Sequence, residues 1–376
     1  MTATPGAGPA PPALFTPFTV RAVTFRNRVV VTPMCQYIAQ DGHVVDWHYA
    51  HHGRFSLGGV GGAIVEASAV TREGRITHGC LGIYADSHVE GLRRIVAIYR
   101  AQKIPIGIQI AHAGRKASAA VPLEGAQPLA TCDPGRAWQI VAPSAIAMTD
   151  GWPTPHALEE REIDALVESF ATAARRAVTA GFDFLEIHGA HGYLVNSFFS
   201  PIANTRTDRW GGSLERRMRF PLAVARAVRA ALPERMPLFY RTSSVDGLDG
   251  GVTIEDTVAL ARELKTRGVD LIDCSSGGIT GPSGRALTPQ APGYLVPYAR
   301  AVRSAAAIPT MAVGLIVAAR QADEIIASGS ADLVAMGRQL LEDPNFVLHA
   351  ARELGHPEPF SVLSESYRFF LERRRL

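Results

Sequence analysis

The chain has 376 residues, with 38 Lys and Arg against 35 Asp and Glu, which gives a formal net charge of +3. A charge so close to zero excludes the strongly basic surface typical of nucleic-acid-binding proteins. A content of 47% hydrophobic and 19% charged residues excludes a disordered or fibrous chain. The composition therefore predicts a globular protein, long enough for one α/β barrel.

The chain starts with MTATPGAGPAPPALF, which lacks the basic segment and the apolar core of a signal peptide. We expect residues 1–13 to form a flexible tail. No apolar stretch approaches the roughly 20 residues of a membrane helix, so we expect no membrane partner. The four cysteines lie far apart without metal-ligand spacing. Free thiols and a cytoplasmic location are the simplest interpretation.

From residue 27 onward, short apolar segments alternate with amphipathic ones, a pattern typical of parallel strands joined by helices. The predicted strands span residues 28–34, 63–70, 106–112, 184–189, 238–243, 271–276, 310–315 and 333–338. The clearest helices span residues 159–180, 214–231, 254–267, 294–306 and 318–328. Eight such units predict a single-domain (β/α)8 TIM barrel over residues 14–360. We expect a capping hairpin in 14–27 and a long loop over 116–160, after the third strand.

The carboxyl ends of barrel strands build the active site in this architecture. The most informative strand end is HGAHGY, from His188 to Tyr193. Two imidazoles three positions apart can converge on one oxygen and donate hydrogen bonds as it becomes negative. Tyr193 adds a hydroxyl able to act as a general acid. The alternative, that His188 and His191 are structural or metal ligands, stays open at this point.

The last two strands end in Val313-Gly314 and Gly337-Arg338. Barrels often bind phosphate there through backbone N–H groups, and glycine permits the close approach. We therefore expect a phosphate group at these positions.

Three other strand-end residues carry groups that require an explanation. Arg241 needs an anionic ligand or partner, and a core ion pair with Glu66 or Glu186 is the alternative. Gln109, in an apolar strand, must satisfy an amide donor and an acceptor, which suits a planar imide-like ring edge. Cys35 is open to a simpler interpretation as a small buried hydrophobic residue.

These features resemble, in order and spacing, the Old Yellow Enzyme family of FMN-dependent ene-reductases. The resemblance covers nearly the whole chain. Cys35 followed by Gln36 and Tyr37 is similar to the thermophilic-like bacterial subclass, which has an active-site cysteine. The motifs that carry the resemblance are LFTPFTVRAVTFRNRVVVTPMCQY, VEASAVTREGRIT, IQIAHAGRKA, GFDFLEIHGAHGYLVNSFFSP, NTRTDRWGGSLERRMRF and VAMGRQLLEDP.

The resemblance implies an FMN cofactor and a role for each candidate that contacts it. Along the flavin, with the Cys35 thiol near N5, would lie Thr32, Pro33, Met34 and Cys35. Ala67 and Gln109 would address the pyrimidine edge, and Arg241 would lie near N1 and the C2 carbonyl. The phosphate would be held by Gly314, Gly337 and Arg338.

The resemblance also implies NADPH or NADH as the reductant and small-molecule enones, which are α,β-unsaturated carbonyl compounds, as substrates. His188 and His191 would bind the carbonyl oxygen, Tyr193 would protonate the α-carbon after hydride transfer, and Tyr37 would help hold the substrate. No GxGxxG motif follows a strand, which fits a nicotinamide held in the barrel mouth. The charge of Arg115, of Lys116 or of the loop over residues 116–160 gives a hypothesis for the selection of NADPH through its extra phosphate.

Two departures from the family pattern affect these expectations. Gly189 stands where members often carry Ala or Phe, a change expected to alter loop flexibility more than chemistry. Phe370 stands where a member of the subclass has the Trp that reaches into the neighbouring subunit's active site. We therefore expect residues 361–376 to contact a neighbouring subunit in a homodimer or homotetramer, with Phe370 binding substrate there.

A metal-dependent or glycosidic hydrolase on the same barrel is the alternative function. Glu186, His188 and His191 would then be acid, base or ligands. The seventh strand, however, offers no second carboxylate, and no third ligand stands at a fixed spacing.

Overall fold

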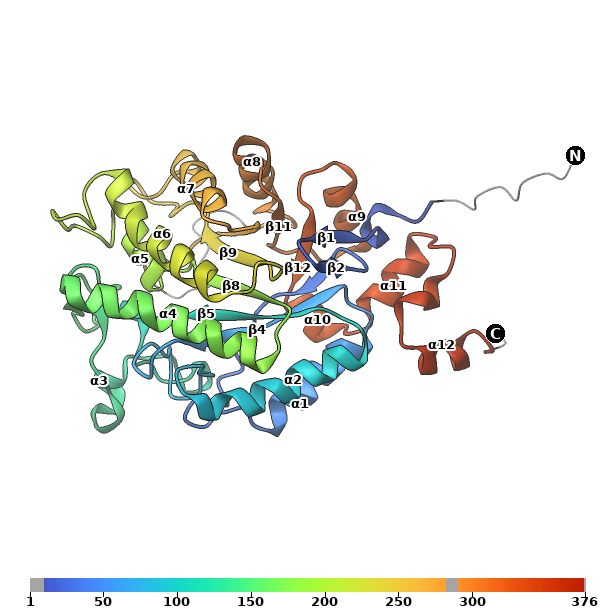
Figure 1. Cartoon of the computed structure of the whole chain (residues 1–376), viewed down its shortest axis with the longest axis horizontal. Helices are drawn as coiled ribbons and strands as arrows, with labels where there is room; N and C mark the ends of the chain where they lie inside the picture. Colours follow the sequence, from blue (N-terminus) through green and yellow to red (C-terminus); the bar gives the residue numbers. More distant parts are fainter. Residues whose placement is uncertain (1–9, 282–289, 375–376) are drawn as a thin grey trace, which may run out of the picture.

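The computed structural model of the chain describes residues 10–281 and 290–374. Its centre is a closed barrel of eight parallel strands in chain order, with β12 pairing back onto β3, so the predicted TIM barrel is confirmed (Figure 1). The barrel strands are β3 (Val29–Val31), β4 (Gly62–Ala69), β5 (Ile106–Ala111), β8 (Phe184–Gly189), β9 (Leu238–Ser243), β10 (Leu271–Ser275), β11 (Thr310–Ala312) and β12 (Leu333–Met336). Residues 1–9 of the predicted tail lie outside the described residues.

Two strands end earlier than their apolar runs predict. β3 stops at Val31, just before Pro33, which has no N–H to continue the ladder. β11 stops at Ala312, because Gly314 and Leu315 take left-handed φ values of 106° and 51°. In both cases the chain leaves the sheet where the candidate site begins.

Helices surround the barrel, and the five predicted ones occur within two residues of their expected bounds. These are α4 (Glu160–Ala180), α6 (Leu214–Ala231), α7 (Ile254–Thr266), α8 (Val296–Ala306) and α9 (Ala319–Ala327). The structure adds α1 (Asp46–Leu57), α2 (Val89–Ala101), α5 (Leu194–Phe199), α10 (Arg338–Glu342) and α11 (Phe346–Glu353). The segment of α1 reads DWHYAHHGRFSL, which has no apolar stripe to predict a helix.

The amino-terminal end of the barrel is closed by the predicted hairpin. β1 (Phe18–Val20) pairs antiparallel with β2 (Val23–Phe25). The Phe25 ring lies 5.5 Å from the ring of Phe184 and 6.3 Å from that of Phe239, measured between centroids. Because Phe184 and Phe239 stand at the start of β8 and β9, this aromatic cluster closes one end and leaves the carboxyl ends of the strands for a site.

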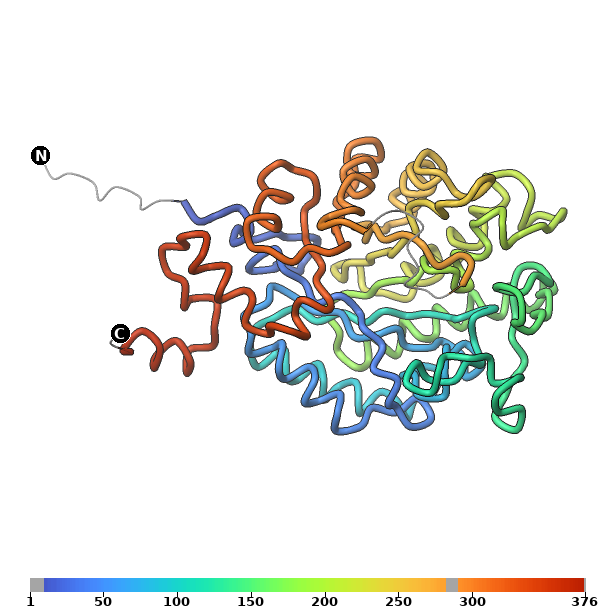
Figure 2. The backbone as a smooth tube through the Cα atoms, turned by 180° about the vertical axis from the view of Figure 1, so that it is seen from behind, coloured from blue at the N-terminus to red at the C-terminus, as the bar shows by residue number. Residues whose placement is uncertain are grey.

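Two segments outside the repeat lie at opposite ends of the molecule. The long loop after β5 carries α3 (Leu129–Cys132), β6 (Val141–Ala142) and β7 (His156–Ala157). The chain ends in α12 (Glu365–Leu371). Figure 1 and the reverse view in Figure 2 both place α12 far from α3. Among the described residues, no helix combines the length and apolar character needed to cross a membrane.

Candidate active site

A cavity of about 570 Å³ opens at the carboxyl ends of the barrel strands. It is lined by residues of β9, β10 and β12 and by the segments that follow β3, β8, β10, β11 and β12. Eight of the candidate residues line it, namely Thr32, Pro33, Met34, His191, Arg241, Gly314, Gly337 and Arg338. Residues separated by up to about three hundred positions in the sequence therefore share one surface.

Two glycines keep one side of this cavity open. A Cβ on Gly314, where φ is +106°, would lie 2.9 Å from Cγ of Leu295. A Cβ on Gly337 would lie 3.0 Å from Cγ2 of Thr32. Both contacts are closer than carbon atoms normally approach. A ligand at this side of the cavity therefore faces backbone rather than side chains.

Arg241 directs a partly satisfied cation into the cavity. Its Nη1 donates to Oγ1 of Thr32 at 2.7 Å and lies 3.3 Å from Oδ2 of Asp273. Its Nε is buried and has no hydrogen-bond partner. The alternative interpretation, a core ion pair with Glu66 or Glu186, is wrong about the partner, because Asp273 on the adjacent strand faces Arg241 directly. A buried cation with an unpaired donor favours an anionic or carbonyl ligand.

Gln109 and Ala67 lie beside the cavity rather than on its lining. Nε2 of Gln109 donates one N–H to Oε1 of Glu186 at 2.8 Å, which leaves the second N–H and the carbonyl oxygen to meet a ligand. Ala67 lines a small adjoining pocket together with Cys80 and Tyr193.

His188 and His191 are neutral hydrogen-bond donors. Nδ1 of His188 accepts from the N–H of Ala190 at 3.3 Å, which leaves the proton on Nε2. Nε2 of His191 lies 2.8 Å from Oγ of Ser275. Burial, and secondly the charge of Arg241, lowers the pKa of both imidazoles well below its usual value. The two rings meet edge to face with centroids 5.1 Å apart.

The HGAHGY loop takes an unusual backbone path that turns these rings together. His191 and Gly192 have φ values of +62° and +74°. A left-handed non-glycine residue costs roughly 1–2 kcal/mol, and here Oγ of Ser243 offsets this cost by accepting the N–H of His191 at 2.9 Å. A Cβ on Gly192 would lie 2.2 Å from the carbonyl oxygen of Gly278, so only glycine fits that position.

Tyr193 is buried between an imidazole and a lysine. Its ring lies 5.0 Å from the ring of His188, and Nζ of Lys116 lies 5.3 Å from its centroid. Nζ donates to the carbonyl oxygens of His191 and Gly278 at 2.8 and 2.9 Å. Burial lowers the pKa of Lys116 to about 7. Sequence reasoning gave Lys116 only a hypothetical role in NADPH selection and did not place it beside Tyr193, because its partners are backbone carbonyls distant in sequence.

The hypothesis that Arg115 or Lys116 selects the phosphate of NADPH has no support in these contacts. Arg115 is 1% exposed, and Nη2 donates to the carbonyl oxygen of Ile279 at 2.6 Å. Lys116 is buried on the two carbonyls described above. Both cations are engaged with the backbone and turned away from solvent.

Cys35 and Tyr37 stand on a loop held by a buried carboxylate. Glu66 on β4 accepts from the N–H of Gln36, and Nε2 of His48 lies 3.1 Å from its Oε1. Burial, followed by the charge of Glu66, raises the pKa of Cys35 well above its usual value, so Cys35 is a thiol at neutral pH. Tyr37 has a left-handed φ of 56°. Glu66 therefore fixes the conformation of this loop by accepting the backbone N–H of Gln36.

Phe370 does not join the other candidates. It lies on α12 and is 71% exposed, at the end of the molecule opposite α3 (Figures 1 and 2). It does not line the cavity of its own chain.

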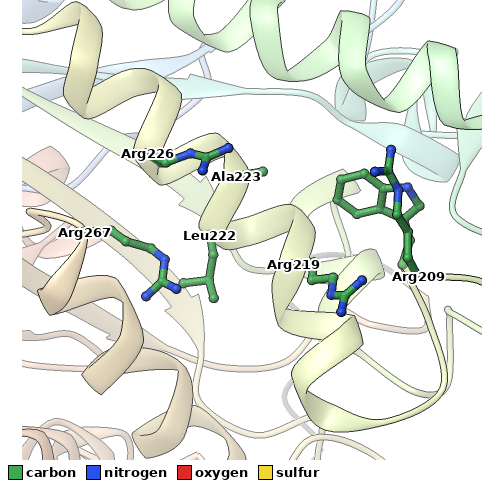
Figure 3. A pocket seen from close by; sticks show the side chains of 7 residues that line it. Arg209, Arg219, Leu222, Ala223, Arg226 and Arg267 are labelled. Atoms are coloured by element: carbon green, nitrogen blue, oxygen red, sulfur yellow. The ribbon is translucent and has the colours of Figure 1, made fainter.

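A second hollow, of about 260 Å³, lies outside the barrel and holds none of the candidates (Figure 3). Arg219, Leu222 and Arg226 project from α6 along it, with Arg267 at one end and Arg209 at the other. Arg209 pairs with Glu160. This groove offers positive charge but no acid, base or nucleophile, so we place the chemistry in the barrel mouth.

No group of three or more His, Cys, Asp or Glu within the described ranges is arranged to hold a metal ion. Glu186 faces Gln109, and its other contacts are with Arg241 and Asp273 rather than with the two imidazoles. The hydrolase alternative is not supported.

Comparison with known proteins gives a consistent result. A family model described as the NADH:flavin oxidoreductase / NADH oxidase family matches residues 13–356. An NADPH dehydrogenase of Geobacillus sp. (strain WCH70) is 44% identical over 354 residues, covering 94% of this chain and 97% of that protein. An NADPH dehydrogenase of Bacillus subtilis (strain 168) is 42% identical over 354 residues, covering 94% and 98%.

Solved structures agree with this result. Morphinone reductase superposes with a TM-score of 0.75 at 27% identity, covering 93% of this chain and 91% of its own. The old yellow enzyme from Trypanosoma cruzi gives a TM-score of 0.75 at 25% identity, covering 91% and 92%.

Proposed function

The chain belongs to the NADH:flavin oxidoreductase / NADH oxidase family, and from this premise we propose that it is an FMN-dependent NAD(P)H ene-reductase that reduces the activated C=C bond of enones. The observation that carries the proposal is the mouth of the barrel. There Arg241 and His191 line one cavity, and the neutral imidazole of His188 packs against His191 on one side and Tyr193 on the other.

The residues of the cavity fit FMN on three grounds. The volume of about 570 Å³ suits a tricyclic ring with its ribityl phosphate. Arg241 offers a buried N–H without a partner, as required beside the electron-rich N1 and C2 carbonyl. The open glycine side at Gly314 and Gly337, with Arg338 next to it, gives a phosphate access to backbone N–H groups.

The flavin contacts follow from this placement. Thr32, Pro33 and Met34, which line the cavity, would lie along the ring, and the neutral thiol of Cys35 would lie near N5. Gln109 would present its carbonyl oxygen and its second amide N–H to the pyrimidine edge, because Glu186 engages only one N–H, and Ala67 would lie beside it. When bound, FMN supplies the hydride acceptor and donor, and NADPH or NADH supplies the reducing equivalents.

The protein contributes two hydrogen bonds and a proton. His188 and His191 donate to the carbonyl oxygen of the substrate, which polarises the conjugated alkene. Their neutral state lets the same hydrogen bonds strengthen as the oxygen becomes negative. Tyr193 then gives its hydroxyl proton to the α-carbon. The Lys116 ammonium, 5.3 Å from the Tyr193 ring, favours the phenolate that remains. Tyr37 helps to hold the substrate.

A spectrum and a half-reaction test this function. We expect the purified protein to be yellow and to carry one FMN per chain. After anaerobic reduction by NADPH, cyclohexenone should reoxidise the flavin. The saturated ketone cyclohexanone is the matched control and should leave it reduced. A colourless protein without affinity for FMN, or a reduced flavin indifferent to cyclohexenone, would refute the proposal.

The exposed aromatic end of α12 supports a further part of the same proposal. In a homodimer or homotetramer, residues 361–376 contact the neighbouring subunit and Phe370 enters its site. Residues 375–376 lie outside the described part. Truncation before Tyr367 should change the substrate preference and the sedimentation coefficient, and a variant unchanged in both would contradict it. The cytoplasmic location stays a prediction.

A further inference from the structure

A layer of buried polar side chains crosses the barrel core just below the cavity. It consists of Gln109 on β5, Glu186 on β8, Arg241 on β9 and Asp273 on β10, which are consecutive strands. The backbone register sets Gln109 opposite Glu186 and Arg241 opposite Asp273. Both carboxyl groups belong to fully buried residues, with 0% exposure. The layer therefore forms one electrostatic unit.

The layer is enclosed on the side away from the cavity. Phe184 and Phe239 precede Glu186 and Arg241 by two residues on their strands and pack in the apolar cluster of the amino-terminal end. His188 follows Glu186 by two residues on the same face, toward the cavity. The groups that act on Glu186 are Asp273, Arg241 and Gln109.

Several buried carboxyl oxygens of this layer have no hydrogen-bond partner unless the layer holds an additional proton. Oε1 of Glu186 accepts from Gln109, but Oε2 of Glu186 and both carboxylate oxygens of Asp273 are buried without a hydrogen-bond partner. Glu186 and Asp273 face each other at hydrogen-bonding range. Two ionised carboxylates are both acceptors and cannot bond to each other. One proton between them gives each a partner.

The charges lead to the same result. One guanidinium, that of Arg241, faces two carboxyl groups. Two ionised carboxylates would leave a net negative charge in the core, which is strongly unfavourable. Burial raises the pKa of both groups, and the charge of Asp273 raises that of Glu186 further. Because Oδ2 of Asp273 lies 3.3 Å from the guanidinium, the remaining negative charge is favoured on Asp273 and the shared proton on the side of Glu186.

We propose that Glu186 and Asp273 share a single proton, and that the one negative charge left on the pair is the counterion that sets how strongly Arg241 acts on the bound flavin. The inference rests on the proposed function. Glu186 and Asp273 are positioning residues, because they act through Arg241. Nothing in the pair itself reacts.

The mechanism is a balance of charges on Arg241. Reduction adds negative charge to the flavin ring, which Arg241 attracts. The charge on Asp273, 3.3 Å from Nη1, partly cancels that attraction. Removing the charge on Asp273 should make reduction of the bound FMN easier. A variant that keeps this charge should keep the midpoint potential of the wild type.

The midpoint potential of the bound FMN tests the balance. Glu186→Gln copies the protonated acid and keeps the charge on Asp273, so its potential should stay close to that of the wild type. The double variant Glu186→Gln with Asp273→Asn leaves no negative charge and should shift the potential to more positive values. Asp270→Asn is the matched control. It removes a carboxylate from the opposite end of β10, where Asp270 pairs with Arg21 at 2.7 Å, and should leave the potential unchanged.

Infrared spectroscopy of the protein without flavin tests the proton directly. The wild type and Asp270→Asn should show the carbonyl band of a protonated carboxyl group that Glu186→Gln loses. A wild type and a Glu186→Gln variant with the same carboxyl bands would overturn the proposal. Two results for the midpoint potential would also overturn the proposal. One is a potential in Glu186→Gln as high as in the double variant, and the other is a double variant with the potential of the wild type. A protein that binds no flavin refutes the proposed function instead, and the infrared comparison still decides whether the proton is shared.

Discussion

Gly189→Ala is expected to be one of the most disruptive single-methyl changes in the barrel. Gly189 ends β8, directly after His188, in a backbone conformation open to any residue. A Cβ added there would lie 2.2 Å from both Cζ and Oη of Tyr240. Tyr240 is fully buried on the adjacent strand, and its ring occupies the space of the missing side chain. The sequence predicts that Gly189 affects the flexibility of the loop. The structure shows instead that glycine is required here because the Tyr240 ring fills the space of a side chain.

The size of the effect follows from the overlap. Non-bonded carbon atoms rest about 3.5–4.0 Å apart, so the new methyl group or the Tyr240 ring must move by more than about 1 Å. Overpacking of this kind costs about 1–3 kcal/mol, occasionally more, and we expect about 3 kcal/mol because both neighbours are strands. A displacement of 1 Å can cost about a hundredfold in a site that depends on alignment. Because His188 precedes Gly189, binding of phenolic ligands should weaken too.

The assay is a double-mutant cycle. Urea unfolding of the apoprotein would be followed by circular dichroism and tryptophan fluorescence for Gly189→Ala, Tyr240→Val and the pair. In the Tyr240→Val background we expect Gly189→Ala to cost less than about 1 kcal/mol, because the obstructing ring is gone. Gly53→Ala is the control. Its Cβ meets nothing within 4 Å on α1, and it should stabilise the helix by about 0.5–1 kcal/mol. An equal cost of Gly189→Ala in both backgrounds would refute the packing argument.

Four further outcomes follow from the site. Tyr193→Phe should slow flavin reoxidation by cyclohexenone by roughly 10²–10⁴ and leave reduction by NADPH unchanged, and equal slowing of both half-reactions would contradict its role as the acid. His188→Ala should weaken binding of a phenol by about 10- to 100-fold in a spectral titration, whereas unchanged affinity would remove it from the oxyanion site. Gly314→Ala should lower FMN content, while Gly355→Ala, which shares a positive φ but meets nothing within 4 Å, should not. The pKa of Lys116 is lowered from 10.5 to about 7 on folding, so the unfolded chain binds more protons above pH 7. Stability should therefore rise with pH from about 7 to 9, by up to about 1.4 kcal/mol per pH unit, and Lys116→Met should flatten that rise in urea titrations.

The sequence predicts the barrel well because its signals are local. Each strand is a short apolar run, and β8 and β9 match their predicted spans. The strand ends also predict which side chains gather in the mouth, since parallel strands bring their carboxyl ends to one face. α1 escapes prediction because four of its residues, His48, His51, His52 and Phe55, pack through aromatic contacts or burial rather than an aliphatic stripe.

The partners of those side chains are not predictable in the same way. The sequence offers Glu66 and Glu186 as alternative ion-pair partners of Arg241, and only the register of β9 against β10 selects Asp273. The position of Lys116 depends on two carbonyls placed by left-handed turns at His191 and Gly278. Such pairings depend on which strands are adjacent and on local φ values, neither of which composition or periodicity encodes.

The hydrogen-bond partners of the three buried cations, Arg115, Lys116 and Arg241, show which of them is available to a cofactor. Arg115 and Lys116 lie near the mouth, but their donors are held by the carbonyl oxygens of Ile279, His191 and Gly278. They therefore stabilise loops and do not compete for a ligand. Arg115 and Arg241 each keep an Nε without a partner, but Arg115 does not line the cavity and Arg241 does. Because only the unpaired donor of Arg241 belongs to a residue that lines the cavity, the electrostatic response of the site to an electron-rich ring depends on Arg241 and on the carboxyl pair behind it.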